Sequence, residues 1–484
     1  MNTRFSRGRF VLIALIGLAP LCVGAQANDN ASESIAEILS NLRELTQVPA
    51  FSVAIVRNGH VVAQSAVGEV DTRNHFNALP EHRFRLASVS KVIGATMLAS
   101  LVQDGDLNPK APISDYMAGL PEQYRVLSAL QLLSHTSGLP HYQARDALRG
   151  KIHFDTAVEA LDSVGDRPLI AAPGESYLYS SHGYTILSAL YETISGEPID
   201  QSARVFVEDF SARESPVLED RRQRDSRRSN VFEVDADGAT TLKPRDQSYS
   251  PFGTGFVASA ADLAYFGDAV LHSPQLGEET RELLFQPVRL SDGGKTGRYF
   301  YEVAFGWRVG KDLSGRTVYH HAGVTQGARS ALILYPESGL SIAFLSNAAW
   351  TASIERTGFA LANIVLENQS PATPSGHHNF TGVFDGNEIS GTFSCDAGNV
   401  TCRLSDDLGA LSEWLLQYSP NKELKMGWPS LLVRGESGQA LKIVTSVGVV
   451  EMRRTLESLS YDTFQAELGN GRELVIRFSE RLLQ

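Results

Sequence analysis

One serine and one lysine, three residues apart, have the types and spacing of a nucleophilic pair. Ser88 and Lys91 begin a segment whose apolar residues recur at helical intervals up to a stop signal at Asp104-Gly105. On a helix, this separation places both side chains on the same face. A helix N-terminus disfavours an ammonium group, which helps a lysine stay neutral and accept the serine proton. Its free N–H groups can also face a developing oxyanion.

The blander interpretation makes Ser88 a helix cap and Lys91 a solvated side chain. The same spacing recurs at Ser419 and Lys422, with Pro420 between them and strand-like residues around them. We interpret this second occurrence as a turn. The context of Ser88, rather than the pattern itself, therefore makes it the candidate nucleophile.

Further blocks with hydroxyl, phenol or imidazole groups, all but one of them with glycine, follow Ser88 along the chain. Three of them, at 173–184, 252–262 and 321–324, precede or begin a predicted helix or strand. The blocks are 132–139, 173–184, 246–249, 252–262 and 321–324.

The order of these blocks resembles that of the serine β-lactamase and penicillin-binding superfamily, in particular its class C-like branch, which includes esterases and D-aminopeptidases. The resemblance covers about residues 34–366. It implies an α+β fold, with a β-lactamase/transpeptidase-like antiparallel sheet flanked by helices. It also implies acyl transfer through a covalent acyl-enzyme that water then hydrolyses, on a small-molecule or peptide substrate, without a metal or other cofactor.

The resemblance assigns roles to individual residues. Ser88 is the expected nucleophile, Lys91 the proton acceptor, and Tyr179 the phenol that shares proton transfer and helps to expel the leaving group. A phenol has an ordinary pKa near 10, so Tyr179 needs nearby positive charge, which Lys91 can supply. The backbone N–H groups of Ser88 and Val324 are the expected oxyanion hole. The expected substrate-binding residues are Ser181, His321, Ala322, Gly323 and, by its position, Tyr249.

Two departures from the family pattern bear on the substrate. Ser181 stands where the family often has an asparagine that binds the substrate amide, and a hydroxyl lacks the paired donor and acceptor of an amide. His321 stands where β-lactamases commonly have a lysine that helps to bind the substrate carboxylate, and an unperturbed histidine is largely neutral near pH 7. We therefore expect an ester or amide hydrolase, peptides included, with slow or absent β-lactam turnover.

Two other functions stay open. One is a β-lactamase or D,D-peptidase that acts on cell-wall peptides. The other is a non-catalytic sensor or scaffold that retains the fold for binding.

Three histidine and lysine features compete with these assignments. The tripeptide Lys295-Thr296-Gly297 matches the family's third motif literally, but it lies in a turn-like loop ahead of a predicted strand, so we place the motif at His321. His135 is expected to brace a loop, because the chain has no G-x-S-x-G elbow for Ser–His catalysis. His320 is expected to point away from its neighbour, since adjacent strand residues face opposite sides.

The elements that must position these residues form two units. Strands are predicted at 51–56 and 60–64 and again at 303–309, 330–334 and 341–345, with helices between, so one sheet joins both ends of a domain at 34–366. A polar, proline-containing linker is predicted at 367–375. Short β-type runs separated by turn signals predict a small all-β barrel or sandwich at 376–484.

The first 27 residues have the parts of a secretory signal peptide. Three arginines precede an apolar run that ends in small residues, and Pro20 interrupts the run, which is also short for a transmembrane anchor. We therefore expect a secreted or periplasmic protein with no integral span after signal removal.

Charge and cysteine content limit the partners further. The chain has 43 basic and 55 acidic residues, and the signal holds three of the basic ones, so 40 against 55 leaves a formal charge of −15. This acidity argues against nucleic acid as a partner, whereas self-association stays open. Cys395 and Cys402 flank a turn between strand-like runs, which predicts a disulfide in an oxidising compartment rather than a zinc site.

Overall fold

The computed structural model describes residues 29–143, 146, 150–235, 237–298, 300–351, 354–396, 398–406, 409–417, 427–455, 460–468 and 471–483. The expected signal peptide and the second Ser-x-x-Lys pattern, at Ser419 and Lys422, lie outside this described part. Within it, no helix has both the length and the apolar character that a membrane span requires.

An eight-stranded antiparallel sheet joins the two ends of the N-terminal domain, as the sequence predicts. Its order is β3-β2-β1-β13-β12-β11-β10-β9, and β1 pairs with β13 along seven residues. The strands are β1 (Ala50–Arg57), β2 (His60–Asp71), β3 (Phe76–Asn77), β9 (Tyr301–Val303), β10 (Arg308–Lys311), β11 (Thr317–Thr325), β12 (Ala328–Tyr335) and β13 (Leu340–Ser346).

The single strand predicted at 303–309 is wrong. The chain turns after β9, where the Ala304 N–H donates to the carbonyl of Trp307 at 2.8 Å and Gly306 adopts a φ of +82° that favours glycine. Two short strands, β9 and β10, therefore replace one longer strand. As a result, Arg308 becomes the first residue of β10.

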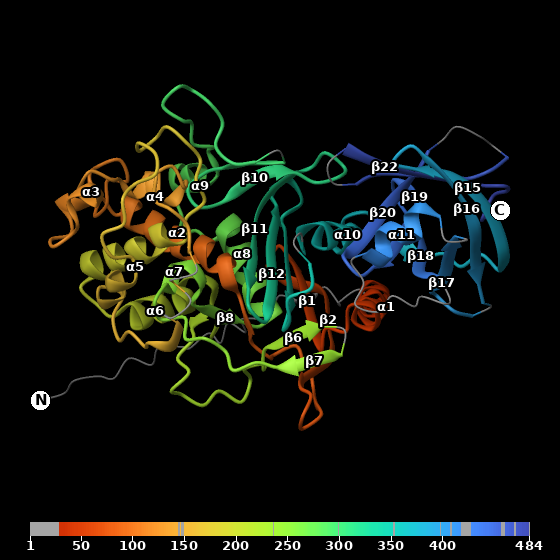
Figure 1. Cartoon of the computed structure of the whole chain (residues 1–484), viewed down its shortest axis with the longest axis horizontal. Coiled ribbons are helices and arrows are strands. Elements are labelled where there is room, and N and C mark those ends of the chain that lie inside the picture. The colour runs from red at the N-terminus through yellow and green to blue at the C-terminus, as the bar shows by residue number, and fades with distance from the viewer. Residues whose placement is uncertain are drawn as a thin grey trace, which may run out of the picture.

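The two faces of this sheet support separate apolar cores, because side chains alternate along each strand. On β1, Ala54 and Val56 belong to one core, and Val53 and Ile55 to the other. The first face packs against α8, and its core extends to other helices of the domain (Figure 1). The longer helices on this side are α2 (Ser90–Gln103), α5 (His182–Ser195), α6 (Ile199–Ser211), α8 (Ala260–His272) and α9 (Glu278–Phe285).

Shorter elements join these helices and support the same side of the domain. The short helices are α3 (Glu122–Arg125), α4 (Ala129–Leu133) and α7 (Pro251–Thr254). A small sheet combines β4 (Phe84–Arg85), β8 (Phe256–Ala258) and β5 (Val217–Leu218), and a hairpin combines β6 (Phe232–Asp235) and β7 (Gly238–Thr241).

The C-terminal part is a closed antiparallel barrel, so the barrel alternative of the sequence analysis is confirmed. Strands β15 to β22 follow one another around the ring, which closes where β15 pairs with β22. Buried phenylalanines at 380, 393 and 464 each pack against the ring of Phe478. The strands are β15 (Gly376–Phe384), β16 (Asn387–Cys395), β17 (Cys402–Asp406), β18 (Trp428–Gly435), β19 (Gly438–Thr445), β20 (Gly448–Thr455), β21 (Thr463–Leu468) and β22 (Arg472–Phe478), with α11 (Ala410–Gln417) between β17 and β18.

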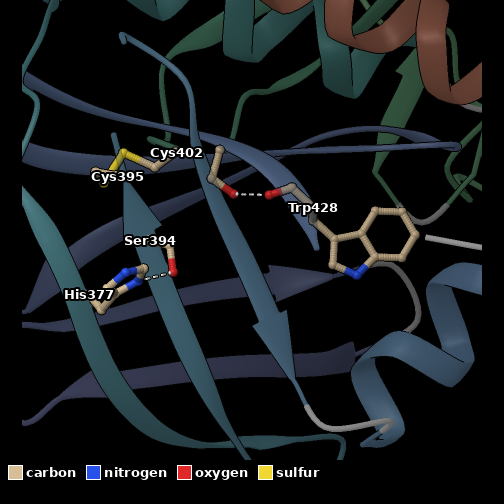
Figure 2. Close-up of a disulfide and its surroundings, with 6 residues drawn as sticks. His377, Ser394, Cys395, Cys402 and Trp428 are labelled. Carbon is tan, nitrogen blue, oxygen red and sulfur yellow. Dashed lines mark hydrogen bonds between the residues drawn. A yellow bond between two sulfur atoms is a disulfide. The ribbon is translucent and has the colours of Figure 1, made fainter. Parts of the chain in front are cut away.

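The expected disulfide links two neighbouring strands of this barrel. Cys395 ends β16 and Cys402 begins β17, with an S–S distance of 2.09 Å (Figure 2). Beside it, His377 on β15 shares a hydrogen bond of 2.8 Å with Ser394. The disulfide therefore links the end of β16 to the start of β17 across the turn between them.

The barrel packs against the second face of the sheet through two helices, α1 (Asp29–Thr46) and α10 (Ile354–Leu366). α10 contacts both β12 and β20, and α1 contacts both β2 and β19 (Figure 1). The segment predicted as a linker is anchored in this interface: β14 (Ser370–Pro371) pairs with β18, and buried Glu367 pairs with Arg316 and Arg453. The two parts consequently share one continuous apolar core.

Candidate active site

Ser88 lies in a tight turn directly before α2. The turn is a short 3-10 helix, η1 (Ala87–Val89), and Ser88 retains 9% of its surface. Ala87 has a φ of +46°, a left-handed conformation that residues with a side chain seldom adopt. Backbone strain of this kind concentrates at functional sites. Here it immediately precedes the predicted nucleophile.

Three predicted catalytic side chains meet at the Ser88 hydroxyl. The Tyr179 hydroxyl donates to Ser88 Oγ at 3.0 Å, and Lys91 Nζ lies 3.1 Å from the same oxygen. Lys91 also donates to the carbonyl of Gly253 at 2.8 Å. This second bond directs one N–H of Lys91 away from the serine, so that the amine in its neutral form can present its lone pair to Ser88.

Burial and mutual charge poise Lys91 and Tyr179 for proton transfer. Burial lowers the pKa of Lys91, although the Tyr179 phenol partly opposes this change. Burial by itself raises the pKa of Tyr179, but the positive charges of Lys91 and Arg308 act in the opposite direction, and the pKa falls below its ordinary value. Lys91 therefore eases loss of the Tyr179 proton, whereas Tyr179 makes Lys91 hold its own proton more firmly, as in a coupled pair.

A glycine allows β11 to approach the nucleophile turn. A Cβ atom at Gly323 would lie 2.2 Å from the carbonyl oxygen of Leu86 and 3.1 Å from the Cβ of Ala87. Ser330 on β12 strengthens this contact by donating to the same Leu86 oxygen at 2.5 Å. The third motif thus needs glycine for close packing, and Val324, half exposed, follows it along the cleft.

Two histidines brace the loop that carries Tyr179. Nδ1 of buried His135 accepts the N–H of Ser180 at 3.1 Å, and its ring lies 4.2 Å from the Tyr179 ring. Nδ1 of His141 accepts the N–H of Ser181 at 3.3 Å. Burial lowers the pKa of His135 far below 6.5 and that of His141 to about 4, with Lys91 adding to both effects. Both rings are therefore neutral supports, as the sequence analysis expected for His135.

His321 and its neighbour occupy opposite faces of β11, as alternation predicts. His321 is buried, with its ring 6.5 Å from that of Tyr179, and Nδ1 donates to its neighbouring carbonyl at Ala322 over 2.8 Å. Burial, with Arg308 and Lys91 nearby, lowers the pKa of His321 far below 6.5. His320 instead packs against Tyr301 and a helix residue beyond the sheet. His321 therefore brings no positive charge to the site.

Arg308 brings a cation to the site instead. Its side chain is largely buried and donates to a Glu355 carboxylate oxygen at 3.0 Å, and the guanidinium lies 4.6 Å from the centre of the Tyr301 ring. Burial acts to lower the pKa of Arg308, but Tyr301 and Glu355 outweigh it and keep the group charged. The positive charge of Arg308 also acts on Tyr179 and helps to lower its pKa.

These residues border a cavity of about 1020 Å³, here called the catalytic cleft. Ser88, Tyr179, Ala322 and Val324 line it, whereas Ser181, His321, Gly323 and Tyr249 are outside its described lining. Tyr249 packs against Tyr142, with 5.9 Å between the two ring centres.

The literal tripeptide at 295–297 lies elsewhere. Lys295 is exposed and pairs with Glu302, and the buried Thr296 hydroxyl donates to backbone carbonyls. In the described residues, no group of three or more His, Cys, Asp or Glu side chains is arranged to hold a metal ion.

The family model described as beta-lactamase matches residues 35–365, which is more than half of the chain. The chain belongs to the beta-lactamase family. Its relatives include the human mitochondrial serine beta-lactamase-like protein LACTB, which is 24% identical over 414 residues, 66% of this chain and 74% of the relative.

Solved structures of other proteins share the fold. The structure of SurE covers 92% of this chain and 98% of its own, with a TM-score of 0.59 and 18% identity. EstCE1, described as a hydrolase with promiscuous acyltransferase activity, covers 69% of this chain and 97% of its own, with a TM-score of 0.58 and 19% identity. SurE thus matches a longer part of the chain than EstCE1 does.

The sequence analysis missed Arg308, Glu355, His141 and Tyr177, all of which line the catalytic cleft. His141 lies two residues after the block at 132–139, so extending that block includes it. Arg308 has no local signal, because the sequence pattern predicts one continuous strand at 303–309. Glu355 begins α10 and reaches the site only through the fold.

Proposed function

We propose that this protein is a serine hydrolase that transfers the acyl group of an ester or amide to Ser88 and then to water. The observation that carries the proposal is the convergence of Lys91 and Tyr179 on one hydroxyl, at 3.1 Å and 3.0 Å. Among the described residues Lys91 has no carboxylate partner, and a lysine buried against a hydroxyl without one favours a role in proton transfer over a role in stability.

In the first step, Ser88 Oγ attacks the substrate carbonyl and forms a C–O bond. Its proton passes to the Lys91–Tyr179 pair, whose lowered pKa values favour the form that accepts it. The carbonyl oxygen becomes an oxyanion, held by the backbone N–H groups of Ser88 and Val324. The pair then returns the proton to the leaving group as the bond to that group breaks.

In the second step, water attacks the acyl-enzyme. The Lys91–Tyr179 pair takes a proton from that water, the oxyanion forms again in the same place, and Ser88 leaves with the proton restored. EstCE1 supports this proposal by analogy, because it shares the fold and is described as a hydrolase with acyltransferase activity.

A peptidase for substrates with a free carboxylate is the second candidate, and Arg308 favours it. A buried guanidinium that lines the cleft can bind a carboxylate through paired N–H groups, which the neutral His321 cannot do. Glu355 already pairs with this guanidinium and reduces its free charge. Paired peptide substrates that differ only in a C-terminal carboxylate or amide would separate the two candidates.

We also propose that the protein is exported. The features of residues 1–27 support this, and so does the disulfide, since disulfides persist in oxidising compartments. Sequencing the N-terminus of protein secreted from its native cell would test the proposal.

Steady-state hydrolysis of a short activated ester and of the matching amide tests the main proposal. Ser88→Ala should remove turnover of both substrates, while Ser100→Ala, farther along α2, should retain it. Equal activity in the Ser88 variant and the wild type would contradict a Ser88 nucleophile.

A further inference from the structure

A second cavity adjoins the catalytic cleft where the barrel meets the sheet domain. This interdomain cavity has a volume of about 680 Å³, within the size range of cavities that bind small ligands. Four residues line both cavities: Leu313, Arg356, Glu467 and Leu468. The last two belong to β21 of the barrel, so the C-terminal part of the chain forms a wall of the catalytic cleft.

An apolar surface leads from Ser88 toward this second cavity. Phe300, Leu313 and Val324 line the cleft, and each leaves about half of its surface exposed, at 54%, 52% and 50%. Large apolar side chains exposed together in one cleft mark a binding surface for apolar groups. Leu313 stands at the junction of the two cavities, so the surface continues into the interdomain cavity.

The interdomain cavity itself is lined mainly by apolar groups from both parts of the chain. Trp350 and Ala349 come from the sheet domain, and Trp414, Val449 and Ala466 from the barrel. Two of its charged groups are already engaged: Arg329 donates to three backbone carbonyls, and Glu451 pairs with Lys442 and Arg453. Arg472 also lines the cavity and pairs with Asp385, while Arg356 and Glu467 mark the junction with the cleft.

We propose that the interdomain cavity binds the long apolar chain of the substrate whose ester or amide group reacts at Ser88. The proposal rests on the proposed hydrolase function and gives it a substrate class: esters or amides with an extended aliphatic chain. The barrel is then a specificity-determining part of the enzyme. Short substrates occupy the catalytic cleft alone and gain nothing from the second cavity.

Chain-length dependence of hydrolysis tests this proposal. Each fully buried methylene favours binding by roughly fourfold, so kcat/KM for p-nitrophenyl octanoate should exceed that for the acetate by at least roughly 30-fold. A second series, acetate esters of alcohols of rising length, identifies which side of the scissile bond enters the cavity. A preference for long chains in either series supports the proposal, and no preference in both overturns it.

Two variants narrow the cavity from opposite sides. Ala349→Phe and Ala466→Phe each place a ring in it without touching Ser88, Lys91 or Tyr179. The long-chain preference should fall at least tenfold in each, while acetate hydrolysis stays within twofold. Ala239→Phe, on the exposed hairpin β6–β7, is the matched control and should retain the preference. A preference unchanged in both cavity variants would overturn the proposal.

Tryptophan fluorescence tests the cavity without catalysis. Trp350 and Trp414 line it, whereas Trp307 and Trp428 are fully buried in the two cores. In Ser88→Ala protein, 1-decanol should change the fluorescence saturably, and Ala466→Phe should abolish that change. A saturable signal in Ser88→Ala, without ester turnover by the wild-type protein, would support apolar binding in the cavity and reject the hydrolase function. Turnover without a saturable signal would do the reverse.

Discussion

Two fully buried lysines, one at the catalytic cleft and one at the barrel interface, have opposite surroundings. Lys442 on β19 faces Glu451 on β20, pairs with its carboxylate, and donates to the carbonyl of Ala360 at 2.8 Å. Lys91 has no ion-pair partner among the described residues and instead contacts Ser88 and a backbone carbonyl.

Burial lowers the pKa of both lysines, but only Lys442 has a carboxylate to offset the cost. Its ammonium is one half of a structural ion pair. Burial of Lys91 lowers the stability of the fold, and no carboxylate among the described residues pairs with it to offset that loss. The contrast supports the proposed role of Lys91 in proton transfer, since packing alone does not account for its burial.

The largest expected effect on activity is that of Lys91→Met. Activity should fall about 1000-fold or more, because the proton acceptor is lost, while the free energy of unfolding should stay level or rise as a buried amine disappears. Ester hydrolysis and urea denaturation measure the two quantities. Activity within tenfold of wild type would remove Lys91 from the mechanism.

Lys442→Met should give the reverse result. It leaves Glu451 buried with Arg453 as its remaining ion-pair partner in the described structure, so unfolding should become about 3 kcal/mol easier, while kcat/KM of the folded protein stays within about twofold. The double variant Lys442→Met/Glu451→Gln should recover part of that stability. A large loss of activity without any loss of stability would break the comparison.

Tyr179→Phe should lower kcat about 100-fold, since the phenol no longer shares the serine proton. The ring and its contact with His135 remain, so the melting temperature should change little. Tyr191→Phe on α5, away from Ser88, is the control and should keep wild-type activity. Equal losses in the two variants would argue that the phenol at 179 has no special role.

The pH profile sharpens the assignment of the base. The active form has lost one proton from the Lys91–Tyr179 pair, so kcat/KM should fall tenfold per pH unit below an apparent pKa that lies under 10. His135 and His321 stay neutral down to well below pH 6.5 and should add no step there. A rate profile from pH 5 to 10 measures this, and a single step centred near 6.5 would transfer the role to a histidine.

Local patterns in the sequence predicted the residues that meet at Ser88 better than they predicted the residues around them. Ser88 and Lys91 lie within one helical turn, so their contact follows from their spacing. The contact of Tyr179 with Ser88 follows from the family resemblance. The sheet that joins both ends of the N-terminal domain followed from apolar runs and turn signals, which also predicted an all-β C-terminal part but left barrel and sandwich open.

Long-range placement could not be predicted in the same way. Arg308 reaches the cleft because the chain turns at Gly306, which a run of apolar residues concealed. Lys442 and Glu451 meet because of a hairpin register, which patterns of alternation leave undetermined. Leu468 lines the cleft, although 380 positions separate it from Ser88, and only the docking of the barrel brings it there.

The most direct test of the account is the intact mass of the protein after exposure to an activated short-chain ester. Wild-type protein should gain the mass of one acyl group, Lys91→Met should gain it far more slowly, and Ser88→Ala should not gain it. An acyl group of equal yield on Ser88→Ala would place the nucleophile elsewhere and contradict the central claim.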